Sequence, residues 1–271
     1  APSAALRLYG QRVMLRPLVA SDWSAYSSVR LRNEQWLTKW EPQRPSNLLD
    51  PARDPDAFAS RCSARERDRQ MGVACGFGVF VGDDPREPGR NQQFAGEINL
   101  NSIVRGAQQC GTIGYWIDEA RAGNRYIAES VVVVARFAFE QLHLHRIEVC
   151  IVPRNHNSRR VMDVLEFREE GIAKGFLEIN GTWEDHVRYG FLLDEWEARR
   201  DELAKSKNFR FVKLDLADRD GMKALLKEVI KGQDKDGAWR LMFEWQPLGS
   251  SSDAITALVL LALTSSNAPD M

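Results

Sequence analysis

The chain has 271 residues, of which 44% are hydrophobic and 28% are charged, and its formal net charge is −1. This length can bury one large or two modest domain cores, and the balanced charge excludes a general attraction to nucleic acid or acidic lipid. The four cysteines, Cys62, Cys75, Cys110 and Cys150, are widely spaced, which argues against a zinc site or disulfide framework and favours reduced thiols in a cytoplasm.

Neither a targeting segment nor a membrane span is predicted. The first residues lack the charged, apolar and small-residue order of a secretory signal. The apolar segment 254–263 (AITALVLLAL) is about half of the roughly 20 residues that a membrane-spanning helix needs. We therefore expect a cytoplasmic protein with no membrane partner and no nucleic-acid partner.

The first 70 residues predict a strand followed by helices. Residues 11–18 (QRVMLRPL) alternate apolar and charged side chains, as a half-buried strand does. Ser21 or Asp22 is placed to cap the helix that follows. The segment 56–70 is highly charged, and it is expected to be a surface helix with its arginines in solvent.

The middle of the chain predicts three strands and then a long helix. Residues 72–84 and 93–104 are rich in β-formers and are joined by turn residues, which predicts a hairpin. Residues 110–118 form the next strand. After Gly123, apolar residues recur at helical spacing, so a helix is expected there even though it contains four consecutive valines.

The elements that follow complete one mixed sheet. Residues 145–152 predict a strand, 155–165 a short helix and 174–193 a hairpin that turns at Asn180-Gly181. Beyond Trp196 the sequence becomes a polar helical spacer and then a separate strand–helix unit, which indicates an appended extension.

The junction at Gly123 is suited to hold an anion. In residues 114–130 (GYWIDEARAGNRYIAES) a strand ends, the chain turns at glycine and a helix begins at once. The first N–H groups of a helix have no partners within it, and the helix dipole favours negative charge there. The bulky Arg125 stands where a small residue would give the closest backbone approach.

A series of segments in chain order resembles the GNAT superfamily of N-acetyltransferases, and more closely its ribosomal-protein alanine acetyltransferase branch (RimJ/RimL type). The segments are RVMLRPL, WEP, IGYWID, AGNRYIAESV, FAFEQLHLHRIEVCIVPRNHNSRRVM, FREEG and LEINGTWEDHVRY, which span roughly residues 7–196. The resemblance implies an α/β GNAT fold, with a mixed, mostly antiparallel central sheet flanked by helices, over residues 1–196. A C-terminal α/β extension would then occupy residues 197–271.

The resemblance also implies acetyl-CoA as cosubstrate, no metal, and an amine acceptor that is often a protein N-terminus. In the family the pyrophosphate lies over the loop that opens the central helix, the pantetheine arm bonds the preceding strand, and an N-x-x-S motif lies near the thioester. The residues implied to bind the cosubstrate are Tyr115, Trp116, Ile117, Arg121, Ala122, Gly123, Asn124, Arg125, Tyr126, Asn155 and Ser158.

Glu97 and Glu178 are the candidate catalytic bases. An α-amine has a pKa near 8, so positioning and modest help from a carboxylate would suffice for direct attack on the thioester. Glu97 could instead be a solvated strand residue, and Glu178 is one residue out of phase with the family's glutamate. Ser158 could position or protonate the leaving thiolate, or it could simply cap the short helix. Backbone N–H groups of strand 110–118 would stabilise the oxyanion.

Three positions depart from the family pattern and keep alternative functions open. Arg125 replaces glycine or alanine, Val164 replaces a common lysine, and Glu166 replaces a glycine expected at positive φ, a strain of roughly 1–3 kcal/mol. The alternatives are acetylation of a small-molecule amine and a non-catalytic module that binds the cosubstrate or a partner protein. A cationic small acceptor would favour an acidic cleft.

The extension carries a second, shorter resemblance. Residues 208–222 (NFRFVKLDLADRDGM) are similar to an internal strand and turn of NAD-dependent sugar-nucleotide epimerases. The glycine-rich strand–turn–helix fingerprint that would hold the NAD pyrophosphate is absent upstream. NAD binding is therefore not predicted, and the sequence gives no indication of the oligomeric state.

Overall fold

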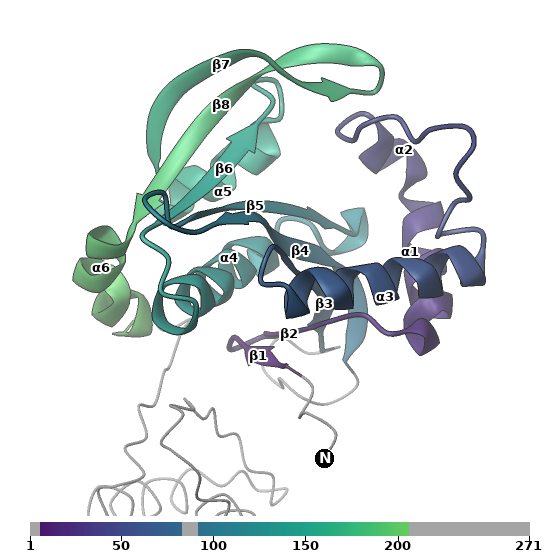
Figure 1. Ribbon diagram of the computed structural model, residues 1–271, viewed down its shortest axis with the longest axis horizontal. Helices are drawn as coiled ribbons and strands as arrows, with labels where there is room; N and C mark the ends of the chain where they lie inside the picture. The colour runs from purple at the N-terminus through teal and green to yellow at the C-terminus, as the bar shows by residue number, and fades with distance from the viewer. Residues whose placement is uncertain (1–5, 83–91, 206–271) are drawn as a thin grey trace, which may run out of the picture. The chain divides into compact units, whose positions relative to one another are not determined.

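A computed structural model describes residues 6–82 and 92–205 of the chain. The strands are β1 (Leu8–Tyr9), β2 (Val13–Arg16), β3 (Cys75–Val81), β4 (Gln93–Val104), β5 (Cys110–Ile117), β6 (Arg146–Ile151), β7 (Arg168–Ile179) and β8 (Thr182–Leu192) (Figure 1). The α-helices are α1 (Trp23–Arg32), α2 (Glu34–Thr38), α3 (Pro55–Gln70), α4 (Tyr126–Arg136), α5 (His156–Leu165) and α6 (Leu193–Lys205). The predicted extension begins at residue 197. Its residues beyond 205, which include the epimerase-like segment, lie outside the described residues.

The strands form one sheet in the order β1-β2-β3-β4-β5-β6-β8-β7. Every neighbouring pair is antiparallel except β5 and β6, which are parallel. The predicted mixed, mostly antiparallel sheet is thereby confirmed. The hairpin β7–β8 turns at Asn180 and Gly181, whose φ angles are 48° and 82°, as the Asn-Gly sequence predicts.

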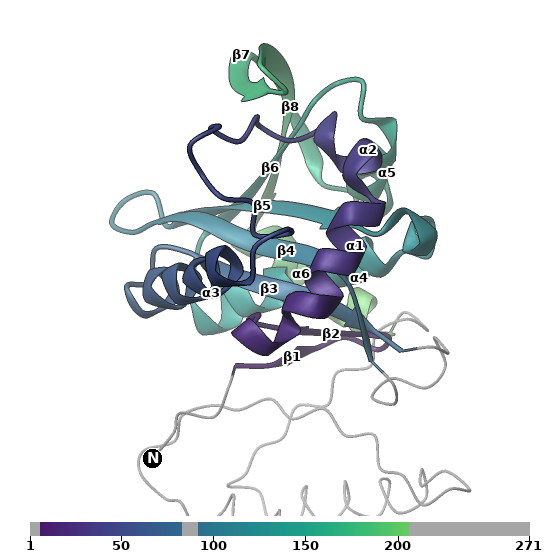
Figure 2. The same cartoon turned by 90° about the vertical axis from the view of Figure 1, so that its right-hand side faces the viewer.

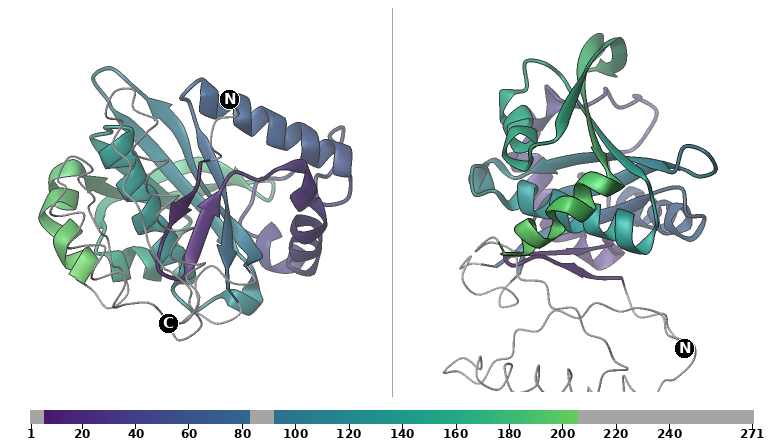
Figure 3. Two further views of the ribbon diagram at one scale, coloured as in Figure 1. Left: turned by 90° about the horizontal axis from the view of Figure 1, so that it is seen from below. Right: turned by 90° about the vertical axis from the view of Figure 1, so that its left-hand side faces the viewer.

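The two faces of the sheet are covered by different helices. Helices α1 and α3 pack over β3 and β4, and α6 lies at the far side of the sheet from them (Figures 2 and 3). Because side chains alternate along a strand, Ile98 points away from its neighbours Glu97 and Asn99 on β4. Phe77, the register partner of Ile98, meets Phe137 at the end of α4 with ring centroids 5.8 Å apart. The side chain of Glu97 therefore faces α1 and α3, and that of Ile98 faces α4.

Helix α4 is buried along its whole length. Its four valines are all buried in a helix that packs against the sheet and α5, and this burial outweighs their weak helix propensity. The helix continues as a π-helical turn over Phe137–Gln141 before β6 begins. None of the helices in the described part of the chain has the length and apolar character required to cross a bilayer.

Candidate functional site

The parallel strands β5 and β6 separate after three residue pairs. Their paired residues are Cys110–Arg146, Gly111–Ile147 and Thr112–Glu148. From Ile113 to Ile117, β5 keeps its pairing with β4, but no strand of the described residues pairs with its other edge. A row of backbone N–H and C=O groups is thus available to an extended ligand in the opening between the strands, as the resemblance implies for Tyr115, Trp116 and Ile117.

The start of α4 lies beyond the end of β5. Residues Glu119–Arg121 form a single 3-10 turn, Gly123 has a φ of 78°, and Arg125 is the N-cap of α4 with φ 62° and ψ 13°. Gly123, Asn124 and Arg125 are exposed, whereas Tyr126 is buried. The arrangement leaves the first N–H groups of α4 open to an anion. Of the two residues that the family pattern has at position 125, glycine and alanine, glycine adopts this positive φ without strain.

A buried ion pair ties this loop to the sheet. Glu129, in the first turn of α4, is completely buried. It accepts hydrogen bonds from the Arg12 backbone N–H at 2.6 Å and from Arg12 Nε at 2.9 Å. Arg12 Nη1 also donates to the carbonyl of Asn124 at 3.1 Å. Arg12 therefore holds both the helix and the loop expected to receive the anion.

A second contact holds the other end of the loop. Asp118, which is buried at the end of β5, is bonded by Arg32 and by Asn33 Nδ2, the latter at 2.8 Å. Burial raises the pKa of Asp118, but the hydrogen bonds from Arg32 and Asn33 outweigh it and leave the pKa below its usual range. Asn33 Oδ1 accepts the Glu119 N–H at 2.9 Å. The junction of α1 and α2 thus fixes the chain where it leaves β5.

Helix α5 brings the N-x-x-S motif to β5. Asn155 is its N-cap and accepts the Ser158 N–H at 3.2 Å. The hydroxyl groups of Ser158 and Tyr115 are 2.9 Å apart, across the opening between β5 and β6. Burial raises the pKa of Tyr115, so its phenol stays protonated at neutral pH. The structure therefore brings together Tyr115, Asn155 and Ser158, as the resemblance implies.

Glu97 lies on the opposite face of the sheet from Ser158. Register pairs Glu97 with Trp116 and Ile98 with Tyr115, so the Glu97 and Tyr115 side chains point to opposite faces. The Glu97 carboxylate is buried and accepts hydrogen bonds from Arg61 Nη2 at 2.7 Å and Trp116 Nε1 at 3.0 Å. A carboxylate on one face and a hydroxyl group on the other thus flank the same segment of β5.

The second candidate base is placed elsewhere. Glu178 is exposed near the end of β7, opposite Trp183 in the hairpin. Strand β7 is the last strand of the sheet, separated from β5 by β8 and β6. Glu178 and Glu97 are therefore not on neighbouring strands. The assignment of Glu178 as a base stays a prediction.

Two cavities open on the face that Glu97 occupies. One is about 500 Å³ and lies between α3 and the β2–α1 connection. The other is about 700 Å³ and lies between α1, the loop after α2, and Asn180 at the tip of the β7–β8 hairpin. The residues that line both cavities are Arg61, Arg65, Glu97 and Asn99.

The expectation that the arginines of α3 are all solvated is wrong for Arg61 and Arg65. Arg61 is paired with the buried Glu97, and its side chain is 23% exposed. Arg65 is half-buried and donates to Asn101 Oδ1 at 3.2 Å. The missed signal is spacing, because Phe58, Arg61, Cys62 and Arg65 recur at i, i+3, i+4 and i+7, on one face of a helix.

Glu166 ends α5 in the left-handed conformation, with φ 52° and ψ 40°. This confirms that the family's glycine position requires positive φ. Arg199 of α6 pairs with the exposed Glu166 carboxylate at 3.0 Å and donates to the Leu165 carbonyl at 2.8 Å. A cation at a helix C-terminus is favourable, so Arg199 stabilises the end of α5 despite the strain at Glu166.

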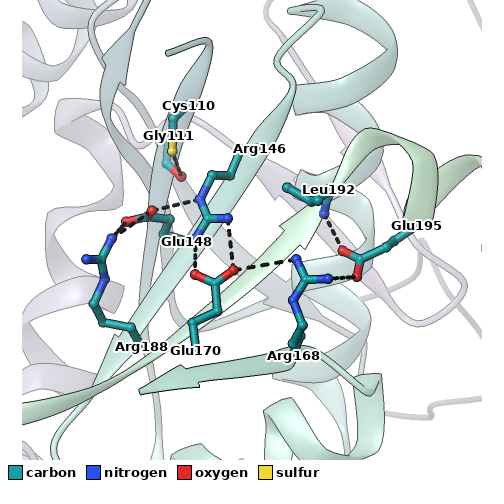
Figure 4. A network of polar contacts seen from close by, with 9 residues as sticks. All are labelled: Cys110, Gly111, Arg146, Glu148, Arg168, Glu170, Arg188, Leu192 and Glu195. Atoms are coloured by element: carbon teal, nitrogen blue, oxygen red, sulfur yellow. Dashed lines mark hydrogen bonds and ion pairs between the residues drawn. The ribbon is translucent and has the colours of Figure 1, made fainter. Parts of the chain in front are cut away.

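An arginine–glutamate network lies where β5 and β6 begin to separate (Figure 4). Glu148 of β6 accepts from Arg146 at 2.8 Å and from Arg188 of β8 at 2.9 Å. Arg146 also bonds Glu170 of β7, and this bond holds the pKa of Glu170 below its usual range. The three C-terminal strands are thus fixed to one another at the base of the opening. Among the residues described, no group of three histidine, cysteine or acidic side chains is arranged to hold a metal ion.

Comparisons with known proteins agree with this architecture. The family model described as an acetyltransferase (GNAT) domain matches residues 12–168. The chain is 32% identical over 179 residues to the probable N-acetyltransferase YjcK of Bacillus subtilis (strain 168), covering 66% of this chain and 93% of that protein. It is 28% identical over 195 residues to the ribosomal protein uS5-alanine N-acetyltransferase of Escherichia coli (strain K12), covering 72% of this chain and 95% of that protein.

A similar solved structure is that of Mycobacterium smegmatis RimJ in complex with CoA-disulfide. Its TM-score is 0.62 at 28% sequence identity, and the match covers 72% of this chain and 89% of that chain. The two proteins therefore share a fold over most of their lengths.

Proposed function

The chain belongs to the GNAT acetyltransferase family, and on that premise we propose that it acetylates the α-amine at the N-terminus of a protein, of the kind that begins with alanine. That it is an N-acetyltransferase which uses acetyl-CoA follows from the family and from its named relatives. The choice of acceptor is the proposal. The Escherichia coli relative is named for acting on an alanine of ribosomal protein uS5. We place the reaction in the cytoplasm, in keeping with four cysteines that are free thiols.

One observation carries the choice of acceptor: the larger cavity is not acidic. A polyamine or aminoglycoside carries several cations and would be favoured by a cluster of unpaired carboxylates. Each carboxylate that lines this cavity is already paired with an arginine. The pairs are Glu34–Arg53, Glu41–Arg30, Asp50–Arg44 and Glu97–Arg61. A protein N-terminus, with a single amine, needs no such cluster.

We assign the chemistry to residues on both faces of β5. Acetyl-CoA supplies an acetyl group activated as a thioester. The acceptor nitrogen attacks its carbonyl carbon as the C–N bond forms and the C–S bond breaks, and Glu97 accepts the proton that the nitrogen loses, directly or through water. The Ser158 hydroxyl, held by Tyr115, donates a proton to the sulfur that leaves, and the proton on Glu97 is returned to Ser158 through solvent. Backbone N–H groups of β5 between Ile113 and Ile117 stabilise the oxyanion.

The proposed acceptor can be tested with the full chain and matched acceptors. We expect kcat/KM to be at least about tenfold higher for a peptide with a free N-terminal alanine than for the same peptide with a blocked N-terminus and an internal lysine, or for spermidine or kanamycin. Release of the CoA thiol gives the rate, and mass spectrometry locates the acetyl group. Faster acetylation of spermidine, kanamycin or the internal lysine would contradict the proposal.

Arg125 gives a separate prediction about acetyl-CoA. Its side chain is exposed and forms no ion pair with any residue in the described ranges, so the guanidinium is available to a phosphate. Replacing Arg125 by glycine is expected to weaken acetyl-CoA binding several-fold, because one charge-assisted contact is lost, and Arg125→Lys should retain part of the affinity. Calorimetric titration measures both. Tighter binding by the glycine variant would mean instead that Arg125 obstructs the loop.

A further inference from the structure

Arg65 lines both cavities, as Glu97 does, and it forms no ion pair with any of the described residues. Its guanidinium donates a hydrogen bond to Asn101 Oδ1 at 3.2 Å. Glu97 and Asp68 are close enough to influence it electrostatically, yet neither lies within ion-pair distance. Burial, followed by the nearby Arg61, lowers the pKa of Arg65, which is the signature of a cation without a counterion.

The surroundings of Arg65 leave space for a ligand group. Gly76 of β3 lies directly beneath it, because a Cβ atom at Gly76 would be 3.4 Å from Arg65 Nη1 and 2.9 Å from Asn99 Oδ1. Asn99 Oδ1 is itself buried and accepts no hydrogen bond within the described residues. A cation with spare donors and a carboxamide oxygen with no donor therefore share one wall of the cavities. Such polar groups are stabilised when a ligand bonds them.

We propose that Arg65 binds a carboxylate of the acceptor, so that the enzyme prefers N-termini with an acidic side chain at residue two, three or four. This inference rests on the proposed N-terminal acceptor and specifies it further. The guanidinium fork suits a carboxylate, which it can bind through two parallel hydrogen bonds. The N–H groups of the same peptide can donate to Asn99 Oδ1.

The position of the acid follows from the geometry of β4. Arg65 lies between Asn99 and Asn101, which are two and four residues along the strand from Glu97. At about 3.3 Å per residue, these positions are roughly 7 and 13 Å from Glu97. An extended peptide advances by the same amount per residue, so an amine at Glu97 places the second to fourth residues within reach of Arg65.

The test uses the full chain and C-terminally amidated hexapeptides that begin with alanine and carry a single aspartate at residue two, three or four. Each peptide has an asparagine twin, so only one carboxylate distinguishes the pair. We expect kcat/KM for at least one aspartate peptide to exceed that of its twin about tenfold or more, mainly through KM. Equal rates for all twins would overturn the inference while leaving the N-terminal acceptor intact. Failure to acetylate any of the peptides would overturn both.

Variants assign the preference to Arg65. Arg65→Gln should bring the aspartate-to-asparagine ratio close to one, and Arg65→Lys should leave an intermediate ratio because the fork is lost but the charge is kept. Gly76→Ala should also lower the ratio, because its methyl group would lie 2.9 Å from Asn99 Oδ1 and force that carboxamide to move beside Arg65, without changing any charge. Arg105→Gln removes an exposed arginine that lines neither cavity and should leave the ratio unchanged. An equal loss in Arg105→Gln would show that the general charge of the protein, rather than Arg65, sets the preference.

Discussion

Replacing Glu97 by glutamine is expected to lower kcat by about 10²- to 10⁴-fold, the range that removal of a general base produces. Glutamine has the shape of glutamate. Its amide oxygen, in the place of Oε2, can still accept from Arg61 Nη2 and Trp116 Nε1, which are each 3.0 Å from that atom, although the 2.7 Å bond to Oε1 is lost. It cannot take a proton from the acceptor. We therefore expect KM for acetyl-CoA to change little, and part of the rate to return at high pH, where an α-amine with a pKa near 8 is already neutral.

Steady-state kinetics across pH with an N-terminal peptide would measure this effect. Glu178→Gln is the matched control, because it makes the same chemical change on the exposed face of β7 and should alter kcat less than about twofold. A reversed result, in which Glu178→Gln abolishes turnover and Glu97→Gln does not, would move the base to the hairpin. An unchanged kcat in both variants would mean that neither carboxylate serves as the base.

Replacing Arg12 by methionine is expected to lower the free energy of unfolding by about 3–5 kcal/mol, the usual result of removing one partner from a buried ion pair. The Glu129 side chain is 0% exposed, and the bond from Arg12 Nε at 2.9 Å is lost. Of the hydrogen bonds that the described residues donate to Glu129, the one from the backbone N–H of residue 12 would remain. Urea unfolding of the purified variants would give the free energies.

Two further variants test whether the loss of stability comes from the broken ion pair or from any replacement of an arginine by methionine. The double variant Arg12→Met with Glu129→Leu should regain most of the stability, because apolar side chains of similar size can replace a buried pair. Arg7→Met removes an exposed arginine near β1 and should change the unfolding free energy by no more than about 0.5 kcal/mol. A loss below about 1 kcal/mol in Arg12→Met would mean that water or a shift of Glu129 compensates for the missing guanidinium.

Local sequence patterns were sufficient to predict most of the elements. The Asn-Gly turn at Asn180 and the positive φ at Glu166 follow from the needs of single residues, and the structure confirms both. The cap of α5 is Asn155, not Ser158, which is the candidate for that role in the sequence. Asp22 also stands at the start of α1, but its carboxylate bonds Arg16 and the Val19 N–H instead of the helix. The carboxylate of Asp22, predicted to cap the helix, instead forms an ion pair because Arg16 of β2 lies close to it.

Long-range pairings could not be predicted from local patterns. The Arg61–Glu97 pair joins residues that are 36 positions apart, and the Arg12–Glu129 pair joins residues 117 apart. The sequence of a charged helix such as α3 predicts a solvent-exposed helix, because the strands against which it packs are distant in the sequence. The acceptor side of the site depends on such pairings, whereas the acetyl-CoA side depends on one contiguous strand–turn–helix segment that a family resemblance can locate.

The seam between β5 and β6 has a further consequence for the protein in a cell. Within the described sheet, strands β1–β5 are connected to β6–β8 by the three residue pairs of β5 and β6. A bound molecule that forms hydrogen bonds with the free edge of β5 adds contacts beside this short region of pairing. Any ligand that binds only the native state stabilises it, by about 2.7 kcal/mol at a concentration 100 times its Kd. The lifetime of this protein against unfolding and proteolysis would then rise and fall with the supply of acetyl-CoA, which would link its abundance to the metabolic state of the cell.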